Sequence, residues 1–191
     1  MAGRRTLREE IWNASTHFLG VVMCFLYFAS GTLGTKIITS CMVLTYSLSV
    51  LYHSIQKKNI KDYFRMLDMV SIHISIASTS IAYCIHADSG FWGCILPILL
   101  GTFGSLYVLK FYGEDVLEET SVLLCIFVGI ICLYNVICFS HGNESVIYFI
   151  SGCSVYLVGL TFYVKDYKPY YHTIWHIFVL IASYIHIMGT I

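Results

Sequence analysis

Long uninterrupted apolar runs are the feature that most constrains the fold of this sequence. Seven of them occupy positions 14–33, 36–55, 68–86, 91–111, 121–140, 145–164 and 172–190, with short polar connections between them. A helix of about 20 such residues is long enough to cross roughly 30 Å of hydrocarbon. The pattern predicts an all-α, polytopic membrane protein, a seven-transmembrane-helix bundle in which residues 1–191 form a single transmembrane domain.

The composition excludes most soluble classes. Of the 191 residues, 58% are hydrophobic and 12% are charged, whereas soluble domains carry about 25% charged residues. The formal net charge is zero, so the basic footprint of a nucleic-acid binder is absent and membrane lipids are the expected partners. The eight cysteines lie in or beside apolar runs without a C-x-x-C spacing, which favours packing over disulfides or a thiolate metal site.

The distribution of lysine and arginine predicts the orientation. Cytoplasmic loops carry the excess of these residues, and a cytosolic N-terminus places all but Lys36 of the eleven on the inner side. We therefore expect an N-in/C-out, multi-pass protein of the cell inner (plasma) membrane, opposite in orientation to a G-protein-coupled receptor. The ten inner residues are Arg4, Arg5, Arg8, Lys57, Lys58, Lys61, Arg65, Lys110, Lys165 and Lys168.

Polar residues gather at one predicted level of the membrane. Ser49 and His53 are four residues apart near the cytosolic end of the second run, and His172 and His176 have the same spacing at the start of the last run. Residues four apart share a helix face. Asp68 opens the third run at nearly the same depth. Because an ionisable side chain within a span costs at least about 2.5–3.5 kcal/mol, the residues of such a cluster are expected to have a partner or a function.

Three imidazoles at one level suit a zinc site with an exchangeable fourth position. Asp68 is then either a direct ligand or the group that holds and deprotonates a metal-bound water. Ser49 is expected to contact the substrate or to support a ligand. The alternative reading is that each histidine is a hydrogen-bonded packing residue.

The remaining histidines have weaker signals. His73, His86, His141 and His186 are expected to be structural or interfacial. His17 lies near the cytosolic side and is expected to contribute by hydrogen bonding with Asn13 or Glu10.

Four segments of the sequence resemble the motifs of the hemolysin III family, the bacterial-type branch of the progestin and adiponectin receptor superfamily. Glu10-Ile-Trp-Asn13-Ala-Ser-Thr16-His17-Phe-Leu-Gly20 is similar to E-x-x-N-x-x-T-H-x-x-G, and Ser49-Val-Leu-Tyr52-His53-Ser54 to S-x-x-Y-H-S. Arg65-Met-Leu-Asp68 resembles R-x-x-D, and the stretch from Pro169 to Val179 resembles P-x-x-H-x-x-W-H-x-F-V. The motifs follow the family's order across nearly the whole chain.

The resemblance implies a seven-helix bundle with zinc held by His53, His172 and His176. It also implies that Asp68 binds the metal through water and that Ser49 is the serine of the site. One departure lies in the third run, where Ser78-Thr79-Ser80-Ile81-Ala82 replaces the usual G-T-Y-T-P. A helix without that glycine and proline is expected to be straighter.

Three functions are consistent with these residues. The first is a metal-dependent hydrolase of lipid amides or esters, ceramide-like lipids among them, or a related membrane homeostasis factor. The second is the pore-forming cytolysin, or toxin, for which the family is named. The third is a non-catalytic membrane sensor or receptor in which zinc is structural.

Overall fold

The computed structural model describes residues 5–139 and 143–191. Arg4, Ser140 and His141, which entered the predictions, lie outside these ranges. The helices are α1 (Leu7–Ser30), α2 (Leu33–Ser54), α3 (Lys58–His86), α4 (Gly90–Phe111), α5 (Leu117–Phe139), α6 (Asn143–Tyr163) and α7 (Tyr171–Met188). Among the described residues, seven helices are long and apolar enough to cross a membrane, which confirms the predicted fold class.

The helices α1 and α3 begin earlier than the apolar runs, because polar residues continue each helix beyond its apolar part. Thr6 caps α1: its Oγ1 accepts the Glu9 backbone N–H, and Glu9 in turn accepts the Thr6 backbone N–H at 2.8 Å. Such a capping box satisfies two backbone donors that a helix start leaves open. The helix α3 is uninterrupted from Lys58 to His86 and includes the segment that departs from the family pattern.

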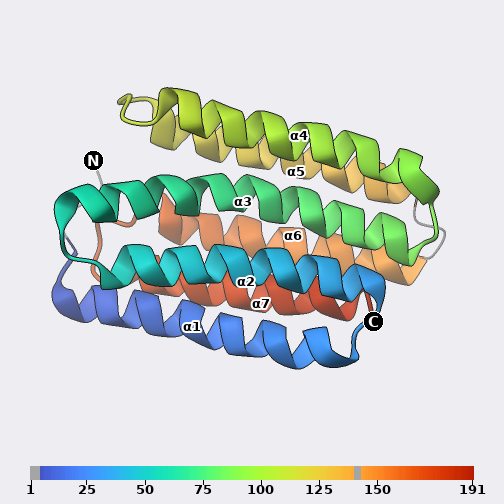
Figure 1. Cartoon of the computed structure of the whole chain (residues 1–191), viewed down its shortest axis with the longest axis horizontal. Helices are drawn as coiled ribbons and strands as arrows, with labels where there is room; N and C mark the ends of the chain where they lie inside the picture. Colours follow the sequence, from blue (N-terminus) through green and yellow to red (C-terminus); the bar gives the residue numbers. More distant parts are fainter. Residues whose placement is uncertain (1–4, 140–142) are drawn as a thin grey trace.

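The bundle is arranged around α3, which packs against α2 on one side and against α4 and α5 on the other (Figure 1). The helix α7 packs mainly against α6 and α1. The helices α1, α2 and α7 therefore lie together, while α4 and α5 form a separate edge of the bundle (Figure 1). The helices α1, α3 and α7 begin at the same end of the bundle, and α2 finishes there (Figure 1). We call this end the site end.

The outside of the bundle is apolar and much of its inside is polar. Large side chains such as Phe25, Leu26 and Trp92 are exposed, as expected for residues that face lipid. Buried positions include Thr35, Ser80 and Asn135. Together with the seven apolar helices of the described residues, this arrangement is that of an integral membrane protein with several membrane crossings.

Candidate metal centre

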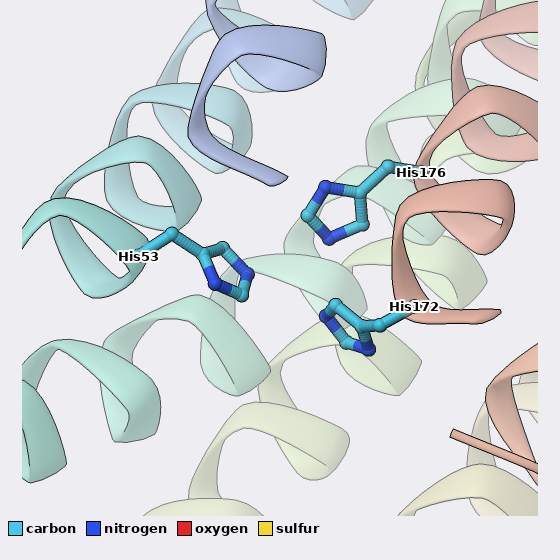
Figure 2. A group of neighbouring side chains, drawn as sticks. All are labelled: His53, His172 and His176. Carbon is cyan, nitrogen blue, oxygen red and sulfur yellow. The ribbon is translucent and has the colours of Figure 1, made fainter. Parts of the chain in front are cut away.

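Three histidines from two helices face one another at the site end (Figure 2). His53 lies in the last turn of α2, and His172 and His176 lie in the first two turns of α7. One potential ligand atom from each lies within 4.8 Å of the others. The ring centroids are 5.0 Å apart for His53 and His176, and 4.6 Å for His172 and His176. The predicted convergence of α2 and α7 at one level brings these three residues together.

The ring of His53 is oriented by a carboxylate from α1. Its Nδ1 lies 2.5 Å from Oε2 of Glu10, and Lys61 holds the other oxygen of Glu10 at 3.1 Å. A carboxylate only accepts hydrogen bonds when it is ionised, so the Nδ1 of His53 carries a proton and its Nε2 keeps a lone pair. That Nε2 is buried and has no hydrogen-bond partner in the described part of the chain.

The ring of His176 is oriented in the same way by a backbone oxygen. Its Nδ1 donates to the carbonyl oxygen of Asn13 at 3.1 Å and lies 3.2 Å from Oγ1 of Thr16. The Nε2 of His176 therefore also keeps its lone pair. His17 stacks on this ring, with centroids 3.7 Å apart and planes at 7°, so the ring is fixed from its face as well as from its edge.

His172 has a different partner. Its Nδ1 lies 3.1 Å from Nη2 of Arg5, while Oδ2 of Asp166 lies 3.7 Å away. Arg5 is joined to Asp166 at 2.6 Å and to the hydroxyl of Tyr52 at 3.1 Å. Burial disfavours the charged form of Arg5, but Tyr52 and Asp166 outweigh it and raise the pKa of the guanidinium above its ordinary value. Arg5 is therefore a permanent cation beside the three histidines.

The donor set fits a transition metal such as zinc. Imidazole nitrogens are preferred zinc ligands, and three of them leave one position open. Metal-bound histidines commonly donate their second ring N–H to a carboxylate or a carbonyl, which is what His53 and His176 do here. The unpartnered Nε2 of His53 gives a further sign of fit, because a buried polar atom of this kind needs a partner.

Asp68 and Ser49, the predicted catalytic residues, lie beside this group and not within it. Among the described residues, the group whose potential ligand atoms all lie within 4.8 Å of one another consists of the three histidines alone. The Asp68 carboxyl interacts electrostatically with Arg5, and the buried Ser49 Oγ has no hydrogen-bond partner among the described residues. Their roles, and direct ligation by Asp68, stay predictions.

His17 does not have the hydrogen-bond partners that the sequence predicts. The expected hydrogen bonds from His17 to Asn13 or Glu10 are not formed, since neither of its ring nitrogens has a partner among the described residues. The Thr173 hydroxyl donates to Oδ1 of Asn13 instead, and Glu10 is hydrogen-bonded to His53.

His73, His86 and His186 do not join the group. His73 and His186 are buried, and each ring lies against a glycine, Gly104 and Gly152 respectively. His86 is exposed at the opposite end of α3.

Sequence reasoning missed three residues of the site. In the sequence, Arg5 is informative only about the membrane orientation, and Glu10 only as a motif residue and a candidate partner of His17. Asp166 carries no signal of its own. Their contacts cross between segments as far as 167 residues apart. The one available signal was an acidic residue in the opening motif, at the level expected for His53.

The chain is similar to known proteins over nearly its full length. The family model described as "Haemolysin-III related" matches residues 5–187. A relative named "Hemolysin-3 homolog" from Bacillus subtilis (strain 168) is 30% identical, over 93% of this chain and 91% of that protein. A "Hemolysin-3" from Bacillus cereus is 28% identical, over 93% of this chain and 88% of that protein. The chain therefore belongs to the haemolysin-III-related family.

Proposed function

We propose that this protein is a zinc-dependent hydrolase of membrane-lipid amides or esters, with its site at the cytosolic face. The observation that supports it is the set of three converging histidines, of which His53 and His176 present free Nε2 lone pairs. The predicted N-in orientation places the site end at the cytosolic leaflet. There a lipid linkage near the headgroup is at the right depth.

The proposed chemistry assigns a task to each residue. His53, His172 and His176 would hold the zinc ion, which supplies Lewis-acid chemistry by polarising a carbonyl and lowering the pKa of water. Glu10 and the Asn13 carbonyl keep two of these rings in the ligating tautomer.

The hydrolytic step itself needs a proton carrier. Asp68 is proposed to take a proton as water adds to the carbonyl carbon, and to return it to the leaving nitrogen or oxygen as that bond breaks. The products are a carboxylic acid and an amine or alcohol. Ser49, whose buried hydroxyl has no hydrogen-bond partner in the described part of the chain, is proposed to bind a polar group of the substrate.

The test separates zinc binding from turnover. Purified protein in detergent is assayed for zinc content and for release of fatty acid from a ceramide. Asp68→Asn keeps the shape of the side chain, so zinc content should stay near that of the wild type while turnover falls about 100-fold or more. Turnover that is unchanged in Asp68→Asn would sink the hydrolytic role of this residue.

A structural metal is the main competing function, and it uses the same ligands. It is favoured by the depth of the site, because His53 and His176 are 1% and 2% exposed. It predicts that a chelator lowers the thermal stability of the wild type while no lipid is consumed. Comparing the lipids of cells that express the wild type with those of cells that express His176→Ala would separate the two.

The names of the two Bacillus relatives suggest a third function, that of a cytolysin. The measurement is dye release from liposomes at increasing protein load. Leakage that scales with protein and persists in His176→Ala would favour a pore that is independent of the metal centre.

A further inference from the structure

The three histidines are not equally ready to bind a metal ion. On His53 and His176, Nδ1 faces an oxygen that accepts its proton, but on His172 it faces Nη2 of Arg5 at 3.1 Å. A guanidinium has five N–H donors and no acceptor. In this contact the Nδ1 of His172 is therefore the acceptor, and the single proton of the neutral ring lies on Nε2.

The contact between Arg5 and His172 is incompatible with metal ligation by His172, whichever of its two ring nitrogens binds the metal. Ligation through Nε2 needs the lone pair that the proton now occupies, so the proton must move to Nδ1. An N–H at Nδ1 would then face an N–H of Arg5. Ligation through Nδ1 would place the metal where the Arg5 N–H lies. In both cases Arg5 must leave His172.

Asp166 is positioned to replace Arg5. Its Oδ2 lies 3.7 Å from the His172 Nδ1 and 2.6 Å from the Arg5 Nη2. Once Arg5 has moved away, a short approach lets this carboxylate accept the Nδ1 proton, as Glu10 does for His53. His172 would then match the other two histidines.

We propose that Arg5 competes with the metal ion for His172, so that metal binding releases Arg5 from the site end. Arg5 is thus a positioning residue that acts through His172. The inference rests on the proposed metal centre but does not depend on hydrolysis. It makes the position of Arg5 a reporter of metal occupancy on the face that we expect to be cytosolic.

The released part is bounded by a second contact. Oε1 of Glu9 accepts the backbone N–H of Tyr170 at 2.9 Å, next to the start of α7. This bond does not involve Arg5, and the capping box of α1 does not either. The start of α1 therefore keeps its place against α7 when Arg5 moves.

The test measures zinc affinity by chelator competition in the purified full-length protein. Arg5→Met removes every donor at similar length and should tighten zinc binding by about tenfold, the weight of one hydrogen bond to a charged group. Arg5→Lys keeps a donor and should fall between the wild type and Arg5→Met. Arg8→Met is the matched control, because it removes an exposed cation from the same segment and should leave the affinity unchanged.

A second readout follows Arg5 itself. In the wild type, zinc should speed trypsin cleavage after Arg5 relative to cleavage after Lys57, which is exposed in the connection between α2 and α3. A purely structural role for Arg5 would not make this ratio depend on zinc.

The outcomes are distinct. Affinity in Arg5→Met that equals or falls below that of the wild type overturns the competition, and so does equal tightening in Arg8→Met. A cleavage ratio that zinc does not change overturns the release of Arg5. If neither the wild type nor Arg5→Met takes up zinc, the metal centre and the proposed hydrolase fall together with this inference.

Discussion

The two ends of the bundle both bury polar groups, but they differ in whether those groups find partners. At the end opposite the site, Oγ1 of Thr32 and of Thr35 donate to the carbonyl oxygen of Thr190 at 2.8 and 2.9 Å. Asn135 donates to the carbonyl oxygen of Gly93 at 2.9 Å. Such groups satisfy one another and join the helices.

At the site end, by contrast, several buried polar atoms have no hydrogen-bond partner within residues 5–139 and 143–191. They include the Nε2 of His53, both ring nitrogens of His17, the Ser49 Oγ and the Asn13 Nδ2. Of the described side chains, His186 is the one outside the site end with such an atom. A buried group without a partner costs about 1–3 kcal/mol. The difference teaches that the polar groups at one end stabilise the fold, while unpartnered polar atoms at the other end are available to the proposed ligand.

The largest expected effect comes from exchanging histidines along one helix. His176→Ala removes one of three ligands, so zinc should fall from about one ion per chain to background. His186→Ala is the matched control, since it removes a buried histidine from the same helix outside the group. Elemental analysis of both purified variants decides. Equal zinc loss in both would break the distinction between the two ends.

The next effect concerns the carboxylate that orients His53. Glu10→Gln keeps the shape of the side chain but removes the charge, so zinc affinity should fall by about 10- to 100-fold. Chelator competition measures this. Glu144→Gln, in the first turn of α6, changes an exposed acidic residue at the other end and should have no effect. Unchanged affinity in Glu10→Gln would show that the contact does not tune the ligand.

A smaller effect is expected where a histidine packs on glycine. A Cβ at Gly152 would lie 2.6 Å from Cε1 of His186, so Gly152→Ala should destabilise the fold by about 1–3 kcal/mol through overpacking. Zinc content should be retained. Gly129→Ala is the control, because a Cβ there meets nothing within 4 Å. Thermal unfolding in detergent measures the difference, and equal melting temperatures would contradict the packing role of His186.

The smallest effect is expected for the threonines at the end opposite the site, whose hydroxyls already have hydrogen-bond partners. Thr35→Val removes one hydrogen bond to Thr190 while Thr32 still donates there, so the loss should be about 1 kcal/mol. The loss should be the same with and without zinc. A loss that doubles when zinc is added would show that the two ends are coupled, which their separate hydrogen-bond networks do not predict.

The helices could be predicted from the sequence because hydrocarbon thickness fixes the length of an apolar run. The convergence of His53, His172 and His176 followed from their i, i+4 spacing and their shared level, which depend on helix geometry alone. The contacts of Glu10, Arg5 and Asp166 could not be read in this way. They depend on how side chains reach across between helices and loops, and no sequence period records that.

The error over His17 has the same origin. Asn13 and Glu10, its expected partners, lie at the expected level of the bundle, but each is hydrogen-bonded to another residue. Thr173 binds Asn13, and His53 binds Glu10. A pattern gives the candidates for a hydrogen bond, while the packing of α1 against α7 selects among them. Ring stacking on His176 was the outcome.

The division of the ligands between α2 and α7 has a consequence for biosynthesis. During translation α2 emerges early and carries one histidine of the group, whereas the other two arrive with α7, after the six preceding helices have been made. A nascent chain that stops before α7 holds only one of the three imidazoles of this group, His53. Metal loading at the proposed centre would therefore be a late event, and a product truncated before α7 would lack two of the three proposed ligands.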